Sequence, residues 1–462
     1  MNMHSLALLT LPLCMAAIQS TEEKPLTRDE TLLAKAEKRY EQGRYKDAWR
    51  AYKALAKEFP DTPAGKVGAR RSQDSCYLGT TLVVGNGPQD NRFDVAIMGD
   101  GYKLDKQKGF DKLVDKIPDV FENQRTFDEY FSYFNFHRVN LISKDDGLDG
   151  HGRVADTALD GQVADTFAGH ATVDRNLVFQ MLAEMGHHDS VAIVFVKAGA
   201  LGMSSGGVAT VGGRSDATTI HEFGHAFANL GDEYTAKTHE RGGVPTRANV
   251  SRTDDPEKVP WAHWIAAKVP GIGVYQGAAG QERGAWKPTP SGCVMEGGAN
   301  FFCRPCREAI ILRIYGTVDG IEQVAPDAHG PDATDTIILD EPFEFSVRVM
   351  TPSSHRLEVS WWVLPFDDAP NTPVLPKGEI DRRKRGPLPP IAAKPVQTRR
   401  NSKTGEYSLR LTPRTLEPGR YRVVVRAIDR TMFRGDRWPW VLEDPRGVLE
   451  SERGWNLVVP GS

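Results

Sequence analysis

The sequence is short of cysteine, of net charge and of long apolar runs. Only five of its 462 residues are cysteine, and the formal net charge at pH 7 is −3. A chain with this balance lacks the basic surface that nucleic-acid binding requires. Beyond residue 20, no apolar run reaches the roughly 20 residues that a membrane-spanning helix needs. We therefore expect no nucleic-acid partner and, once a signal peptide has been removed, no integral membrane segment.

The length and composition suffice for two or three folded domains, because 40% of the residues are hydrophobic and 26% are charged. An apolar stretch at residues 6–18 has secretory-signal length and is followed by small residues, although no Lys or Arg precedes it. We expect residues 1–20 to be a signal peptide and the mature protein to be secreted, periplasmic or at the cell surface. A lipoprotein anchor at Cys14 ranks second, because the Leu-Pro-Leu before it lacks the expected small residue.

Residues 28–72 predict a tetratricopeptide-like helical hairpin, with two helices joined at Gly43. The residues that follow the repeat pattern are Ala36, Tyr40, Gly43, Tyr45, Ala48, Tyr52, Leu55 and Pro60. A single repeat cannot bury both of its faces. The segment must therefore dock on the rest of the chain, exchange with another chain, or remain on its linker. A protein partner for this repeat and a plain hairpin without a binding role both stay open.

Residues 76–316 predict an α/β domain. Residues 93–102 indicate a buried strand that runs into a tight turn, and residues 103–133 carry apolar side chains at helical intervals. Alternating strands return near residues 133–147 and 189–199. Strands that alternate with helices are typical of an α/β sheet. We expect a glycine-rich edge strand at 204–213, to which an extended peptide can add, with an ordinary flexible loop as the alternative.

Two histidines stand four residues apart in "TIHEFGHAFANLGDEY", with a glutamate directly after the first. Side chains four residues apart share a helix face, so His221 and His225 can bind one metal ion. Glu222 then lies beside that ion, where a carboxylate can take a proton from a metal-bound water and return it to a leaving amine. The spacing predicts a hydrolytic metal site, with a chance pattern on an ordinary helix as the alternative.

A catalytic zinc site takes three protein ligands, so a third must come from elsewhere. On an unbroken helix Asp232 would lie about 10 Å beyond the histidines, but Gly231 can adopt the left-handed conformation that ends a helix and turns the chain back. We expect Asp232 as the third ligand and Glu233 as its closest competitor. His239 and His263 are further alternatives, and the two acids would otherwise cap a turn or pair with a base.

Two more residues are candidates for the surroundings of this site. Met295 stands in a glycine-flanked turn ahead of a helix expected to begin near Arg304, and a methionine there can form an apolar floor under the imidazoles. Tyr234 is a candidate donor to the transition-state oxyanion. For Tyr234 we favour a buried aromatic that braces the turn.

In these segments the chain resembles the IgA-peptidase family of zinc metallopeptidases, metallopeptidase family 64. The matching stretches, in the family's order, are residues 93–102, 127–147, 221–234, 259–265 and 284–310. The resemblance implies a metzincin-like zincin fold of α/β (α+β) class and one catalytic Zn²⁺ held by His221, His225 and Asp232. It does not imply IgA as the substrate. The amino-terminal helical repeat departs from the β-rich domain expected there in many relatives.

Two functions follow from this reading. The first is an exported zinc-dependent endopeptidase that hydrolyses peptide bonds of a protein or peptide substrate through a metal-activated water, with Glu222 as general base. The alternative is a binding or adhesion protein with a peptidase-like domain whose metal site is structural or vestigial. The intact general base favours the enzyme, because a binding module needs none.

Four cysteines remain after removal of the expected signal peptide: Cys76, Cys293, Cys303 and Cys306. An even number in an exported chain favours disulfides, with three pairings. A structural zinc site is the rival, because the last three cysteines offer three thiolate ligands. We prefer disulfides, since the sequence shows no fourth ligand nearby.

Residues 317–462 contain strand-like runs separated by turn residues. We expect a β-sandwich accessory domain with a binding role. Residues 376–405 are basic and proline-rich, and predict a solvated loop within the sandwich. A surface patch for an anionic polymer is the alternative for that loop.

Overall fold

The structure is a computed structural model, and it divides the chain into two compact units, residues 1–69 and 70–462, which are described separately. The expected signal peptide with Cys14, and the first part of the basic loop at 376–385, lie outside the described residues. The described ranges are 25–42, 44–73, 76–164, 169–186, 190–213, 215–236, 243–328, 334–369, 386–402, 404–433 and 435–461.

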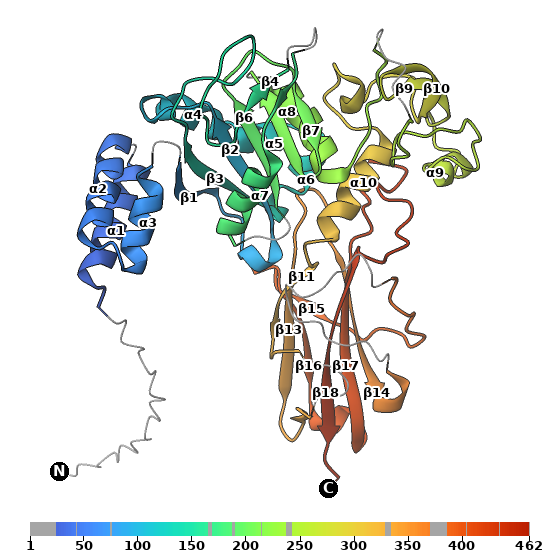
Figure 1. Cartoon of the computed structure of the whole chain (residues 1–462). Coiled ribbons are helices and arrows are strands. Elements are labelled where there is room, and N and C mark those ends of the chain that lie inside the picture. Colours follow the sequence, from blue (N-terminus) through green and yellow to red (C-terminus); the bar gives the residue numbers. More distant parts are fainter. Residues whose placement is uncertain are drawn as a thin grey trace, which may run out of the picture. The chain divides into compact units, whose positions relative to one another are not determined.

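The first unit is helical (Figure 1). A capping box at Thr27, in which Thr27 and Glu30 satisfy each other's backbone amides, begins the first helix. The side chains predicted from the repeat pattern pack between the helices: Ala36, Tyr40, Tyr45, Ala48, Tyr52 and Leu55 are all at most 9% exposed. A third helix follows, which the two-helix expectation lacked. The helices are α1 (Arg28–Glu41), α2 (Tyr45–Glu58) and α3 (Pro63–Arg71), the last of which crosses the boundary at residue 70.

The second unit contains a six-stranded sheet of order β1-β3-β2-β6-β8-β7. The four central strands run parallel, and both outer strands are antiparallel to their neighbours. The expected edge strand at 204–213 is a hairpin whose outer arm, β7, forms the sheet edge. The strands are β1 (Cys76–Val84), β2 (Phe93–Asp100), β3 (Phe134–Ile142), β6 (Val191–Val196), β7 (Met203–Ser205) and β8 (Val208–Gly212).

Apolar cores cover both faces of this sheet, which explains why β2 and β6 are almost continuously hydrophobic. On β2, Val95 and Ile97 face a core shared with α4, α5, α8 and α10, while Ala96 and Met98 face a core shared with α7. The helices are α4 (Gln107–Val114), α5 (Ile117–Glu122), α6 (Arg125–Glu129), α7 (Arg175–Glu184), α8 (Asp216–Ala228), α9 (Ala262–Ala266) and α10 (Arg304–Tyr315). Short pairs complete the region: β4 (Gln162–Val163) with β5 (Ala171–Thr172), and β9 (Tyr275–Ala278) with β10 (Gln281–Lys287).

Two four-stranded sheets follow and share one apolar core, in which Trp361 and Trp455 stack at 5.7 Å. We call this part the two-sheet region. One sheet has the order β11-β13-β16-β15 and the other β12-β18-β17-β14. The strands are β11 (Ile321–Ala325), β12 (Ile337–Ile338), β13 (Phe343–Val349), β14 (Glu358–Pro365), β15 (Arg399–Arg400), β16 (Tyr407–Leu411), β17 (Gly419–Ile428) and β18 (Glu450–Val459).

The chain between β17 and β18 returns to the α/β region. Phe433, Trp440 and Leu449 belong to the same core as β2 and α8, and Phe433 stacks on Trp440 with ring centroids 3.5 Å apart. Residues 70–462 form one compact unit, within which the two-sheet region keeps an apolar core of its own.

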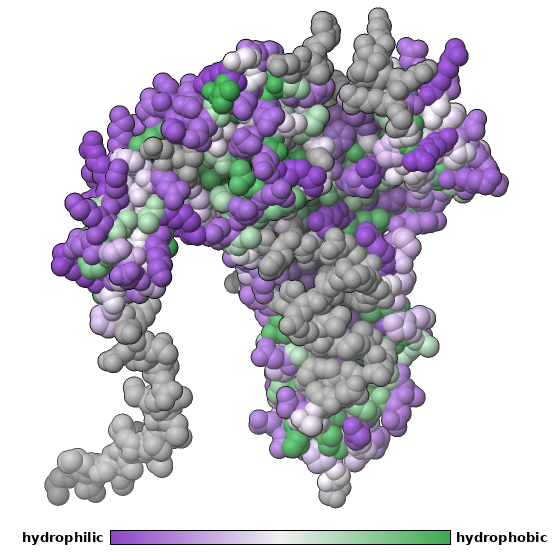
Figure 2. Space-filling view, viewed as in Figure 1, coloured by the Kyte–Doolittle hydropathy of each residue, from purple (hydrophilic) through white to green (hydrophobic). Residues whose placement is uncertain are grey.

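Hydrophilic side chains predominate on the face shown in Figure 2, and hydrophobic ones appear there as small separate patches. Within the described ranges, no helix is both long and apolar enough to span a membrane.

Candidate metal centre

Helix α8 carries both histidines and the glutamate of the predicted site. The Ser215 hydroxyl accepts a hydrogen bond from the Thr218 amide at 3.2 Å and caps the start of the helix. The helix ends at Asn229, whose φ of 54° lies in the left-handed region. The expectation that Gly231 supplies the left-handed residue is wrong, because Asn229, another residue type that tolerates this conformation, makes the turn two residues earlier.

Gly231 is required instead by a close approach. A β-carbon at this position would lie 2.6 Å from Cγ2 of the buried Val250. Asn249 holds the backbone of Gly231 on both sides, accepting from its amide at 2.7 Å and donating to its carbonyl at 2.8 Å. The loop after α8 is thereby held against residues 249–250, and this contact sets the position of Asp232.

The side chains of His221, His225 and Asp232 converge on one point. The two Nε2 atoms are 3.1 Å apart, and Oδ1 of Asp232 lies 3.1 Å from that of His221 and 3.0 Å from that of His225. Four-coordinate zinc, with bonds of about 2.0–2.1 Å, places neighbouring nitrogen and oxygen ligands about 3.3 Å apart. The three atoms therefore fit three corners of a zinc tetrahedron.

Backbone carbonyls orient both imidazoles. Nδ1 of His221 donates to the Val294 carbonyl at 3.0 Å, and Nδ1 of His225 donates to the Leu230 carbonyl at 2.7 Å. Because a carbonyl only accepts, each Nδ1 carries the hydrogen and each Nε2 lone pair faces the centre. Such outer contacts are the usual means of fixing a metal-binding histidine.

The electrostatics of the three residues are coupled. Burial alone would lower the pKa of His221, but Asp232 and the Val294 carbonyl outweigh it and raise this pKa. Burial would raise the pKa of Asp232, yet the two imidazoles hold it well below its ordinary value. Asp232 is therefore negatively charged, which would suit the binding of a divalent cation.

The remaining candidate ligands lie elsewhere. His263 on α9 binds Glu308 at 2.7 Å, and His239 lies outside the described residues. Glu233 turns away from the histidines into a second cluster. Among the described residues, the structure thus gathers His221, His225 and Asp232 and leaves the other expected candidates out of this centre.

Glu222 is 7% exposed and lies against the chain that enters β7. A β-carbon on Gly202 would be 2.5 Å from its Oε1 atom, so the backbone passes directly over the carboxyl group. Burial raises the pKa of Glu222, although the charges of His225 and His221 oppose this shift. A carboxyl group with a raised pKa is a better proton acceptor than an ordinary glutamate.

Met295 and Tyr234 differ in their exposure. Met295, in the short helical turn η4 (Val294–Glu296), is fully buried, and its sulfur would lie 2.9 Å from a β-carbon on Gly224 of α8. It packs against α8. Tyr234 is 39% exposed, and its ring stacks near that of His221 with centroids 6.0 Å apart. The interpretation of Tyr234 as a buried brace is therefore wrong.

A second cluster of donors begins at Glu233, directly after Asp232. Its Oε1 atom lies 3.4 Å from Sγ of Cys303 and 3.1 Å from Sγ of Cys306. Burial, and then the charge on Cys293, raise the pKa of Glu233 to about 8. The three cysteines are free, so the preferred disulfides are not found among them. The structure does not describe the side chain of Cys76. Sequence spacing missed Glu233 here because 60 residues separate it from Cys293.

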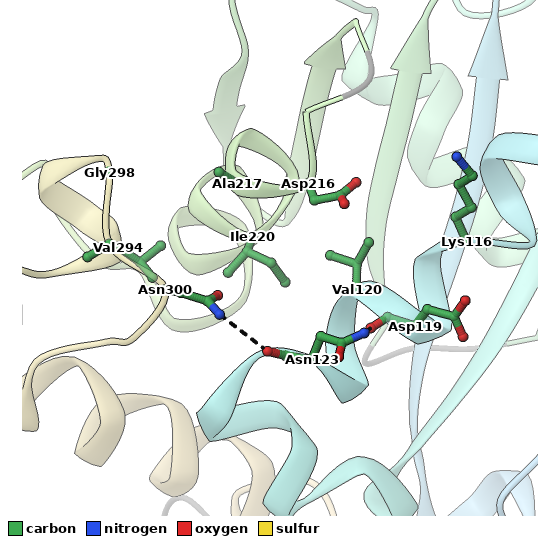
Figure 3. A pocket seen from close by; sticks show the side chains of 11 residues that line it. Lys116, Asp119, Val120, Asn123, Asp216, Ala217, Ile220, Val294, Gly298 and Asn300 are labelled. Atoms are coloured by element: carbon green, nitrogen blue, oxygen red, sulfur yellow. Dashed lines mark hydrogen bonds between the residues drawn. The ribbon is translucent and has the colours of Figure 1, made fainter.

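A cavity of about 630 Å³ is lined by neighbours of the centre, although His221, His225 and Asp232 themselves do not line it (Figure 3). Ile220, which precedes His221, and Val294, whose carbonyl holds His221, both line it. Charged groups stand at its other walls, with Lys116 and Asp119 near α5 and Asp216 at the start of α8. The cavity therefore combines apolar walls with charges of both signs.

Comparison with known proteins finds a family match for part of the chain. The model of the family described as IgA Peptidase M64 matches residues 82–271, which include α8 and Asp232 but end before Met295 and the three cysteines. No curated protein matches the chain. Among solved structures, the chain is similar to the endo-beta-1,4-mannanase from Thermotoga petrophila at 11% identity and a TM-score of 0.16. That match covers 62% of this chain and 42% of the mannanase, and its TM-score is too low to indicate a shared fold or activity. Residues 82–271 are therefore similar to the IgA-peptidase family, whose description names a peptidase.

Proposed function

We propose that the protein is an exported zinc-dependent endopeptidase that hydrolyses peptide bonds of protein substrates. The observation that carries this proposal is the triangle of His221 Nε2, His225 Nε2 and Asp232 Oδ1, with sides of 3.0–3.1 Å. Three nitrogen and oxygen ligands with one position left for water or substrate are the usual composition of a catalytic zinc site. The match of the same segment to the model of the IgA-peptidase family supports the assignment.

The chemistry is divided between the metal and Glu222. Zinc bound at the triangle would polarise the scissile carbonyl and lower the pKa of a bound water to about 7. The Glu222 carboxylate takes the proton of the attacking water and delivers it to the leaving amine. Its burial and raised pKa suit both steps, since the same group must first accept and then donate the proton.

We further propose that the substrate backbone binds along β7. This strand is the edge of the sheet and packs against α8, and Gly202 just before it touches Glu222. An extended peptide that pairs with an exposed edge gains backbone hydrogen bonds at any sequence. Leu201 and Met203, which are 53% and 38% exposed, lie at this edge and can contact substrate side chains.

The cavity beside His221 is the proposed pocket for one substrate side chain. Its apolar walls at Val120, Ile220 and Val294 favour an apolar body, and Asp216 and Lys116 offer charges to a polar tip. Ala217 on α8 is exposed and lines the same cavity. Pockets with apolar walls and few polar groups are typical of ligand sites.

The remaining assignments complete the proposal. The α/β region has a metzincin-like arrangement, with Met295 packed beneath the metal helix. Residues 28–72 form a tetratricopeptide-like module for a protein partner, and the two-sheet region is a β-sandwich accessory domain. Residues 1–20 direct export.

Replacing Glu222 by Gln tests the general base. We expect Glu222→Gln to keep its metal and to lose peptide cleavage, with kcat/KM lower by at least about 10²-fold, the lower end for general base catalysis. The measurements are metal content by elemental mass spectrometry and cleavage of a peptide library. Glu257→Gln, which changes an exposed glutamate in the same way, is the control and should cleave normally.

Cleavage by Glu222→Gln at the wild-type rate would contradict this role for the residue. A wild-type protein that binds zinc but cleaves no peptide in the library would favour the alternative, a binding or adhesion protein with a structural metal. A binding protein has no use for a buried carboxyl group beside a metal triangle, which is why we rank it second.

A further inference from the structure

Four buried donors meet next to the histidine triangle and are separate from it. Cys293 precedes η4, Cys303 and Cys306 occupy the start of α10, and Glu233 follows Asp232. Glu233, Cys293 and Cys306 are fully buried and Cys303 is 4% exposed. The four donor atoms lie within 4.8 Å of one another. The proposed peptidase mechanism uses none of them.

Their spacing fits a tetrahedral metal. Zinc bonds of about 2.3 Å to sulfur and about 2.0 Å to oxygen place sulfur pairs about 3.8 Å apart, and sulfur and oxygen about 3.5 Å apart. Sγ of Cys293 lies 3.9 Å from that of Cys306. Oε1 of Glu233 lies 3.4 and 3.1 Å from Sγ of Cys303 and Cys306. A disulfide needs a sulfur separation of about 2.05 Å, so the observed Cys293–Cys306 distance fits a shared ion better.

The surroundings favour negative charge on the sulfur atom of Cys293. This Sγ accepts hydrogen bonds from the amides of Met295 at 3.4 Å and Cys303 at 3.3 Å. Cys303 and Cys306 lie at the amino-terminal end of the 12-residue α10, whose dipole offsets only part of the cost that burial imposes on a thiolate. Asn249 donates to Oε1 of Glu233 at 2.9 Å, which holds this oxygen among the sulfur atoms.

The nearest cation with a contact to these four residues, Lys287, is already paired with another carboxylate. Nζ of Lys287 donates to the Glu233 carbonyl at 2.6 Å and pairs with Glu296 at 2.6 Å. Four buried anionic ligands without a cation among them would be costly, because each charged group loses its hydration. A divalent ion at their centre would offset much of this cost.

We propose that Cys293, Cys303, Cys306 and Glu233 bind a second zinc ion with a structural role. Soft thiolate ligands select zinc over magnesium or calcium. Four protein ligands leave no open position, as in structural rather than catalytic zinc sites.

The second ion would stabilise the first site through the backbone. Glu233 is bonded to the ligand Asp232, and its amide donates to the Met295 carbonyl at 2.7 Å. Cys293 is bonded to Val294, whose carbonyl orients His221. The structural zinc would therefore connect the segment that carries Asp232 to the turn at Val294 that orients His221.

Metal counting on the full chain tests the proposal. We expect two zinc ions in the wild type, one in His221→Ala and one in Glu233→Gln or Cys306→Ser. With cobalt in place of zinc, thiolate-to-metal charge-transfer absorption should appear in the wild type and in His221→Ala, and should be lost in Cys306→Ser. Cys76→Ser makes the same change in β1 and should keep both ions.

One zinc ion per wild-type chain without thiolate charge-transfer absorption would overturn the proposal. So would a thiol titration of the denatured chain that finds two thiols fewer than its cysteines, which indicates a disulfide. If Cys306→Ser does not fold, His221→Ala carries the test, because its remaining ion must be bound by sulfur. Retention of that ion in a wild type without cleavage would refute the proposed peptidase and leave this inference standing.

Discussion

The two donor clusters begin at consecutive residues but differ in their access to solvent. The side chains of Asp232, His221 and His225 are 30%, 14% and 18% exposed. Glu233 and the three cysteines around it are buried. The first cluster offers three ligands, whereas the second offers four. Ligand number and solvent access together distinguish a site that can bind substrate from one that can only stabilise the fold.

The difference also shows how one short loop serves both clusters. Asn229 ends α8, Asn249 fixes the Gly231 peptide, and the next two side chains diverge to separate centres. A change in this loop can therefore affect one centre or both. Changes to single residues within the loop can separate the two roles.

Asp232→Ala should produce the largest effect on this comparison. It removes the charged ligand, so we expect loss of the catalytic metal and a fall in kcat/KM of at least about 10²-fold, the scale seen when even outer partners of metal ligands are removed. The thiolate charge-transfer absorption of the cobalt protein should persist. Metal content and cleavage assays measure both effects.

Glu233→Gln removes the charge of the next residue, and we expect the opposite result. This variant should lose the metal of the thiolate cluster before it loses the metal of the histidine triangle. An Asp232→Ala protein that keeps full zinc affinity and cleavage would eliminate Asp232 as a ligand. Loss of both ions in Asp232→Ala would show that the two clusters are not separable.

Sequence spacing predicts local parts of this molecule better than distant ones. The four-residue interval predicts that His221 and His225 share a face, and strand β2 and the start of α10 lie where their patterns indicate. The position of Asp232 depends on the packing of Gly231 against Val250, a tertiary contact without a sequence signal. For the same reason the sequence offered no fourth ligand for the cysteines.

Gly231→Ala should have the next largest effect. Its β-carbon would lie 2.6 Å from Cγ2 of Val250, and relieving this overlap should cost about 1–3 kcal/mol of folding stability. Because the displaced residue is the neighbour of Asp232, catalytic zinc affinity should fall more than that of the thiolate cluster. Thermal unfolding and metal titration measure the two quantities.

The double variant Gly231→Ala with Val250→Ala tests whether the overlap with the Val250 side chain causes the loss of zinc affinity. It removes the two methyl groups of Val250, one of which is the clashing Cγ2, and should restore part of the lost zinc affinity, although the smaller side chain leaves a cavity of its own. If the double variant binds zinc no better than Gly231→Ala, the overlap is not the cause and glycine is required for another reason.

A histidine remote from both clusters gives a third, smaller test. His355 lies between two carboxylates, with Nδ1 2.8 Å from Glu129 of α6 and Nε2 2.7 Å from Asp429, which follows β17. The hydroxyl groups of Tyr130 and Tyr315 also donate to Asp429, at 2.9 and 2.7 Å. This network joins the α/β region to the two-sheet region within the second unit.

Burial would lower the pKa of His355, but Asp429 and Glu129 outweigh it and raise the pKa to about 9. A raised folded-state pKa means that protonated His355 stabilises the fold fully below about pH 6.5, its unfolded value, and that this contribution is lost as pH rises through about 9. With allowance for solvent screening, we expect a loss of about 1–2 kcal/mol of folding stability over that range.

A substitution at this histidine tests the expectation. His355→Gln should flatten the dependence of folding stability on pH between about 6.5 and 9, whereas the control His170→Gln should not. The measurement is chemical denaturation with and without chelator. The loss of folding stability at alkaline pH should be the same in the two conditions, because neither metal cluster contributes to it. An alkaline loss that disappears with chelator would instead assign the pH dependence to the metal centres.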